Sequence, residues 1–141
     1  MNLYYEIWVD CIGRMRTIEA NKNNWKIKGL VFITLAMTFN LVFIMSIFQR
    51  DVLGFYFFEI DISSFSEFEN YIATVLLLYM FPCLILNYLL IFFRKRYVFL
   101  QKKYKYRNGK LCAIYYLISF FPPIIFLLYE YSMFCIEIFR K

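Results

Sequence analysis

The sequence has no histidine and only four glycines among its 141 residues. Histidine is the commonest general base and metal ligand near neutral pH, so its absence counts against acid–base catalysis and a histidine-bound metal. The glycines form no phosphate-binding loop. The four cysteines form no CxxC pair and stand beside no histidine, so neither a zinc site nor a thiol nucleophile is indicated. We therefore expect no catalytic residues, no cofactor and no metal, in a protein that is not an enzyme.

Charge is missing from three long stretches of the chain. They run from Gly29 to Phe48, from Tyr71 to Phe93 and from Leu111 to Tyr129, and each is close to the roughly 20 residues that a helix needs to cross a bilayer. The composition is 62% hydrophobic and 23% aromatic, which is typical of a protein with lipid as its solvent. The sequence predicts an all-α integral membrane protein with three transmembrane helices, at residues 25–48, 71–93 and 111–131.

The basic residues are distributed unevenly about these spans. Thirteen of the sixteen lysines and arginines precede the first span or lie between the second and the third. The loop between the first two spans holds Arg50 against five acidic residues. Because cytoplasmic loops carry the excess of basic residues, we expect the N-terminus in the cytoplasm and the C-terminus outside. The resulting single membrane domain, 1–141, has a cytoplasmic segment at 1–24, an outer loop at 49–70, a cytoplasmic basic loop at 94–110 and an outer tail at 132–141.

The basic loop interleaves tyrosines with eight cations. Aromatic and basic residues together can bind single-stranded nucleic acid, but the placement of the charge and its attraction to anionic lipid headgroups explain the pattern without it. We therefore expect a membrane-surface role and no nucleic acid. The predicted membrane-surface residues are Arg94, Lys95, Arg96, Lys102, Lys103, Lys105, Arg107 and Lys110.

The N-terminal segment, residues 3–19, predicts an amphipathic helix. Apolar residues such as Tyr4, Trp8 and Cys11 recur at helical spacing, with Glu6 and Asp10 on another face. One interpretation is an interfacial helix on the cytoplasmic leaflet. The other is a helix packed against the cytoplasmic ends of the spans, and a partner-binding role is a third, less favoured one.

Each span contains a polar residue or a proline near its middle. Asn40, Pro82 and the Pro122-Pro123 pair all lie about 18 Å from the nearest basic residue at the cytoplasmic edge, at about 1.5 Å per helical residue. Proline leaves the carbonyl four residues earlier without its donor. We interpret this midplane layer as a structural one, in which Asn40 bonds a neighbouring helix and satisfies freed carbonyls. The alternative is the broken-helix binding site of a transporter.

The outer loop combines aromatic and acidic residues. It either seals the outer ends of the helices or forms a docking face for a partner outside the cytoplasm. Ser66, three residues before Glu69, predicts a capping box at the start of the second span's helix. The candidate docking residues are Phe55, Tyr56, Phe57, Phe58, Glu59 and Asp61.

Two stretches, WKIKGLVFITLAMTFNLVFIMSIFQRD and RKRYVFLQKKYKYRNGKL, are rich in Ile, Phe, Tyr and Lys. They resemble segments of small multi-span inner-membrane proteins of Bacteroidota-type bacteria, and the resemblance covers most of the chain. It carries no catalytic residues and no assigned activity. What it implies is a bacterial inner membrane and an accessory role.

Two functions remain for a chain of this kind. The first is a non-enzymatic interaction protein, either an accessory subunit of a membrane complex or an immunity protein against a membrane-acting toxin. Its partners would be the lipid bilayer and another membrane or periplasmic protein, or further copies of itself. The second is a small transporter or channel, which would have to be oligomeric because three helices alone do not easily enclose a path.

Overall fold

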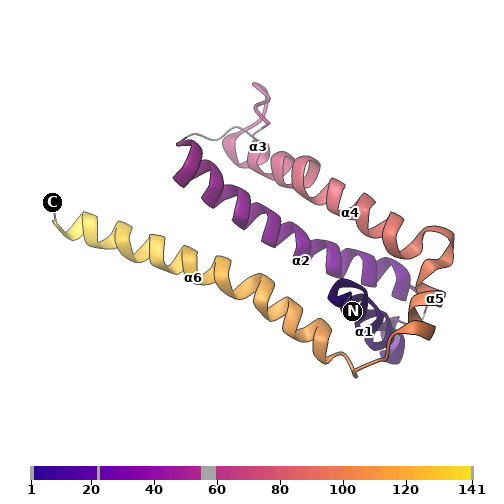
Figure 1. Cartoon of the computed structure of the whole chain (residues 1–141). Coiled ribbons are helices and arrows are strands. Elements are labelled where there is room, and N and C mark those ends of the chain that lie inside the picture. The colour runs from indigo at the N-terminus through magenta and orange to yellow at the C-terminus, as the bar shows by residue number, and fades with distance from the viewer. Residues whose placement is uncertain (1, 22, 55–59, 141) are drawn as a thin grey trace.

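The computed structural model of the protein describes residues 2–21, 23–54 and 60–140, and all the regular structure of these residues is helical, with no strand. The all-α prediction is therefore confirmed. The described residues form six α-helices (Figure 1). They are α1 (Leu3–Thr17), α2 (Trp25–Ile47), α3 (Glu67–Thr74), α4 (Phe81–Asn87), α5 (Arg96–Lys103) and α6 (Lys110–Arg140).

The second predicted span is a continuous run of helical turns with a changing register. Between α3 and α4 lies a π-helical stretch, η3 (Val75–Met80), and after α4 lies another, η4 (Tyr88–Phe92). The N–H of Phe81 bonds the carbonyl of Leu76, five residues back. Pro82, the next residue, has no N–H to continue the regular ladder. The kink expected at Pro82 thus takes the form of a register change.

The predicted basic loop, 94–110, is not all loop. After η4 the chain reverses through Arg94 and Lys95, whose φ angles of 51° and 57° are left-handed, and enters α5. Tyr97 and Leu100 of α5 are buried. They lie three residues apart on one helix face, which is enough to hold a short helix against the protein. The predicted connection between the second and third apolar stretches thus contains a short helix, which was not predicted from the sequence because so few apolar residues establish it.

Helix α2 lies in the middle of a layer, with α4 on one side and α6 on the other (Figure 1). Aromatic side chains join α2 to α6 along their length, and such pairs contribute about 0.5–1.5 kcal/mol each beyond the area they bury. The Tyr116 hydroxyl of α6 also donates to the Phe32 carbonyl of α2. The ring pairs, with their centroid distances, are Phe32–Tyr116 at 3.7 Å, Phe39–Phe120 at 4.5 Å and Phe43–Phe126 at 5.7 Å.

Two helices are long and apolar enough to cross a membrane by length and composition. They lie within Trp25–Leu53 and within Glu67–Lys103, a range that also includes the turn at Arg94 and Lys95. Each has a mean hydropathy of 2.3, and only 22% of each apolar window is buried. The described residues of α6 add a shorter apolar stretch, Lys110–Phe126. Large side chains stand exposed on these helices, for example Leu77 at 57% and Leu117 at 62%. The outer faces of the layer are therefore apolar.

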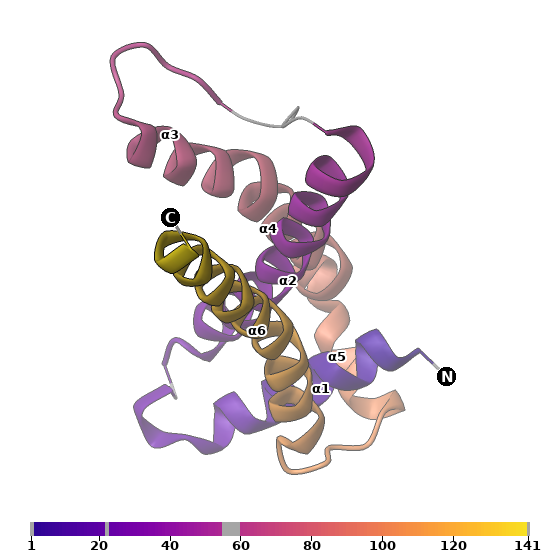
Figure 2. The ribbon, with the colours of Figure 1, turned by 90° about the vertical axis from the view of Figure 1, so that its left-hand side faces the viewer.

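The N-terminal helix α1 lies across one end of this layer (Figure 2). It contacts the beginnings of α2 and α6 and one side of α5. Trp8 and Cys11 are fully buried, and they pack in one cluster with Ile33, Ile91 and other apolar residues. The interfacial-helix prediction is therefore wrong for the apolar face of α1, because that face lies against protein. The other interpretation, packing against the ends of the spans, is confirmed.

The opposite end of the layer carries the outer loop. A π-helical turn, η2 (Phe48–Leu53), extends α2 and ends at Gly54, whose φ of 72° is left-handed. The predicted capping box is present at the start of α3. The Ser66 N–H donates to the Glu69 carboxylate at 2.8 Å, and the Glu69 N–H donates to the Ser66 hydroxyl at 3.4 Å. The helix cap at this end of the layer was thus predicted correctly from the sequence.

Candidate functional site

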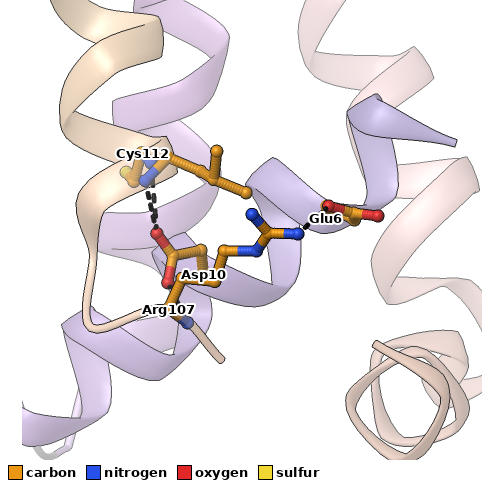
Figure 3. A network of polar contacts seen from close by, with 5 residues as sticks. Glu6, Asp10, Arg107 and Cys112 are labelled. Atoms are coloured by element: carbon orange, nitrogen blue, oxygen red, sulfur yellow. Dashed lines mark hydrogen bonds and ion pairs between the residues drawn. The ribbon is translucent and has the colours of Figure 1, made fainter. Parts of the chain in front are cut away.

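The buried middle of α1 contains a carboxylate that caps another helix. Asp10 is 0% exposed. Its Oδ1 accepts the N–H groups of Arg107 at 2.7 Å and Gly109 at 2.9 Å. Its Oδ2 accepts those of Leu111 at 2.8 Å and Cys112 at 3.3 Å, and Figure 3 shows the carboxylate beside Cys112. The first N–H groups of a helix lack partners within it, and its N-terminal end favours negative charge. Asp10 accepts hydrogen bonds from the first N–H groups of α6 and places a carboxylate at its N-terminal end.

The chain just before α6 is shaped to present these N–H groups. Asn108 and Gly109 have φ angles of 59° and 79°, and asparagine and glycine adopt this left-handed region at the least cost. The Asn108-Gly109 turn expected from the sequence is therefore present. A Cβ at Gly109 would approach the Arg14 side chain to 3.0 Å. Glycine thus serves both the turn and the close approach of α1.

A second carboxylate of α1 lies one turn earlier. The Glu6 side chain is 8% exposed and pairs with the Arg107 guanidinium at 3.2 Å (Figure 3). One of the eight predicted membrane-surface cations, Arg107, is therefore paired with a carboxylate of α1, although its side chain is 51% exposed. The other seven are exposed, and none of them pairs with a carboxylate of the described residues. Glu6 and Asp10 were predicted to lie on the polar face of an amphipathic helix, whereas the structure buries both side chains.

Asn87 joins three segments at the same end. It is 0% exposed and accepts from the Tyr4 hydroxyl at 2.7 Å and the Trp8 indole N–H at 3.3 Å, while its amide donates to the Thr34 hydroxyl at 3.2 Å. It therefore ties α4 to α1 and α2. Burial raises the pKa of Tyr4 to about 12, so this hydroxyl remains a donor at neutral pH.

Two thiols meet between α1 and α6. Cys11 and Cys112 are free and buried, on two helices that contact each other. The neighbouring Cys112 thiol and burial together hold the pKa of the Cys11 thiol above its ordinary range. A thiol with a raised pKa is a poor nucleophile, so Cys11 serves as a packing residue.

The midplane layer is held by a different partner from the one expected. The Asn40 amide of α2 donates to the Ser119 hydroxyl of α6 at 2.9 Å, and this hydroxyl donates to the Tyr115 carbonyl. Pro82 is exposed on α4, while Pro122 and Pro123 lie inside the continuous helix α6. The bond between helices thus uses a serine side chain. It does not use the carbonyls that the prolines free.

The outer-loop candidates are only partly within the described residues. Phe55, Tyr56, Phe57, Phe58 and Glu59 lie outside them. Asp61 is exposed and accepts from the Asn70 amide at 3.3 Å. The N–H of Ile60 donates to the Thr74 hydroxyl at 2.8 Å, and that of Ile62 to the Asn70 side chain at 3.0 Å. The described part of the loop is thus bound to α3.

The buried polar side chains of the described residues have hydrogen-bond partners within the protein. In the described part of the chain, every buried side-chain nitrogen or oxygen has a hydrogen-bond partner, and no group of three His, Cys, Asp or Glu residues is placed to hold a metal ion. The junction of Glu6, Asp10 and Asn87 therefore positions helix ends. Comparisons with protein-family models, curated proteins and solved structures gave no match to the chain.

Proposed function

We propose that the protein is a small, non-enzymatic membrane protein that works by binding another membrane protein. In this proposal the chain crosses a bacterial inner membrane three times, with its N-terminus in the cytoplasm and its C-terminus outside. Its partner is either a complex of which it is an accessory subunit or a membrane-acting toxin against which it gives immunity.

The observation that carries the proposal is an apolar groove beside α2. It has a volume of about 280 Å³ and lies between α2 and the outer half of the second span. Helices associate in lipid mainly by close packing into such grooves, because lipid tails are as apolar as the side chains. We assign the groove to a transmembrane helix of the partner. Its lining residues are Leu35, Thr38, Phe39, Val42, Tyr71, Ile72, Val75, Leu76 and Met80.

The distribution of charge along the layer supports the membrane assignment. Helix α1, the beginnings of α2 and α6, and α5 gather at one end (Figures 1 and 2). That end carries the exposed lysines and arginines of the predicted basic loop. The other end carries the acidic residues of the outer loop, including Asp61, Glu67 and Glu69. The apolar faces between the two ends match the bilayer core.

The arrangement of the described helices gives a single copy no enclosed path, so a channel would need several copies. Because α4 and α6 flank α2 in an open layer, the described helices do not surround a path. The buried polar groups also satisfy one another, which leaves the exposed apolar faces and the groove as the surfaces for contact.

The proposal is tested by affinity purification from membranes in a mild detergent. We expect recovery of a stoichiometric membrane partner, whose identity distinguishes a complex subunit from a toxin. Leu76→Trp should fill the groove and lower the yield of partner. Leu86→Trp is the matched control, because Leu86 is also in the second span and is 46% exposed against 48% for Leu76. Repeated recovery of the chain alone, or equal loss in both variants, would contradict the proposal.

A further inference from the structure

We propose that Lys26 and Lys95 hold the phosphate of an anionic phospholipid in a pocket at the basic end of the layer. This inference rests on the membrane location proposed above. The pocket has a volume of about 280 Å³ and lies between the first turn of α2 and the end of the second span. Its lining residues are Lys26, Ile27, Leu30, Tyr88, Phe92, Lys95 and Tyr97.

The two ammonium groups of this pocket are available for an anion. Neither Lys26 nor Lys95 pairs with a carboxylate among the residues that the structure describes. Nearby Lys28, by contrast, is occupied, since its ammonium donates to the Ala20 carbonyl at 3.1 Å and to the Asn21 side chain at 2.7 Å. Of the two lysines in this turn of α2, Lys28 is thus the one whose ammonium donates hydrogen bonds within the described part of the protein.

Aromatic rings hold Lys26 at the pocket. Its ammonium lies 5.7 Å from the centroid of the Trp25 ring and 5.6 Å from that of Tyr97. Trp25 and Tyr97 themselves form an edge-to-face pair at 5.4 Å, and Tyr97 is 9% exposed. Cation–π contacts of this kind are weak at an exposed site. They orient the lysine toward an anion without neutralising its charge.

The rest of the pocket suits a lipid better than a free phosphate ion. Ile27 is 66% exposed and Tyr88 49% exposed, and both belong to the helices whose apolar faces continue toward the middle of the layer. An acyl chain attached to a bound phosphate would lie along these faces. Basic pockets between transmembrane helices on the cytoplasmic side bind anionic headgroups in this way. Inorganic phosphate would use the lysines and gain nothing from the apolar wall.

The test uses the full-length protein, purified in a neutral detergent and stripped of lipid. Binding of phosphatidylglycerol and of phosphatidylcholine is measured by native mass spectrometry, with and without excess inorganic phosphate. The test variant is Lys26→Gln with Lys95→Gln. The control variant is Lys102→Gln with Lys105→Gln, which removes the same charge from exposed positions outside the pocket.

We expect the wild-type chain to prefer phosphatidylglycerol and to keep it in inorganic phosphate. The test variant should lose about thirtyfold in affinity, at roughly one kcal/mol for each of its two basic residues near the surface, while the control variant keeps wild-type binding. Equal binding of the two lipids, equal loss in both variants, or displacement by inorganic phosphate would overturn the inference. Recovery of the wild-type chain without detergent would instead overturn the membrane proposal.

Discussion

At the scale of single residues, the position of Asp10 explains why α1 is bound as tightly as a core helix. A buried carboxylate is costly unless hydrogen bonds compensate it, and both oxygens of Asp10 accept backbone N–H groups. Two of those donors, Leu111 and Cys112, belong to the first turn of α6, and the other two belong to the turn just before it, so the carboxylate and the start of α6 satisfy each other. The acid is therefore part of the core and not of a wet helix face.

Asp10→Asn tests this role. The amide keeps the shape of the carboxylate but turns one acceptor into a donor that faces backbone N–H groups. Because a buried donor without a partner costs about 1–3 kcal/mol, we expect a fall in thermal stability in detergent nearly as large as for Asp10→Ala. Glu6→Gln is the control and should cost less, since the paired Arg107 side chain is 51% exposed. A fully stable Asp10→Asn protein would contradict the capping role.

Gly13→Ala tests the close approach of α1 to the segment before α6. Alanine in a helix is ordinarily favoured over glycine by about 0.5–1 kcal/mol, but a Cβ here would clash with the Tyr106 ring. We expect Gly13→Ala to destabilise the wild-type protein and to stabilise the Tyr106→Ala protein, as measured by thermal unfolding. Gly29→Ala is the control, because its Cβ would meet only Met15 at 3.9 Å. The same sign in both backgrounds would show that the contact does not matter.

At the scale of elements, the layer depends on how α2 meets its neighbours. The aromatic pairs and the Asn40–Ser119 bond join α2 to α6, and the Thr34–Asn87 bond joins it to α4. The sequence marks Asn40 as a polar residue that needs a partner in lipid. It does not identify Ser119, because a serine can satisfy itself on its own helix and gives no periodic signal.

A double-mutant cycle of Asn40→Leu and Ser119→Ala measures this bond. Hydrogen bonds between helices in membranes average about 0.6 kcal/mol, so we expect each single variant to lower thermal stability modestly and the double variant to lose less than the sum. Asn40→Gln should largely preserve the stability. If Asn40→Leu proved as stable as the wild type, the amide would be retained for another reason.

The capping box at α3 gives an acid-sensitive helix end. The Ser66 N–H and then its hydroxyl hold the pKa of Glu69 below its ordinary value of 4.5. Because the pKa of Glu69 is lower in the folded state than in the unfolded state, ionised Glu69 stabilises the fold at pH values above its ordinary pKa. This contribution to stability is lost as the pH falls through the pKa of Glu69 in the folded state. We expect hydrogen-exchange protection of the first turn of α3 to fall over that acidic range.

Ser66→Ala should lower the same protection at neutral pH, because loss of a serine cap costs about 0.5–2 kcal/mol. Ser64→Ala is the control, since Ser64 is an exposed serine two residues before the cap. Unchanged protection in Ser66→Ala would show that packing alone holds the helix start.

At the scale of the whole molecule, the sequence predicted what depends on local pattern. Uncharged runs reveal the apolar helices, and Ser66, Asn108 and Gly109 reveal a cap and a turn, because each signal lies within a few residues. The junction at α1 could not be predicted in this way. Asp10 is buried because of N–H groups about a hundred residues along the chain, and nothing near Asp10 in the sequence indicates them.

The central claim is that the chain crosses the membrane three times, with α1 and the basic residues in the cytoplasm. Alkaline phosphatase, which is active only outside the cytoplasm, tests it most directly when fused at three points. We predict activity for a fusion after Ser64 and for one at the C-terminus, and no activity for a fusion within residues 100–108, at equal amounts of protein. The reverse pattern, or a C-terminal fusion that is inactive in the membrane fraction, would contradict the account.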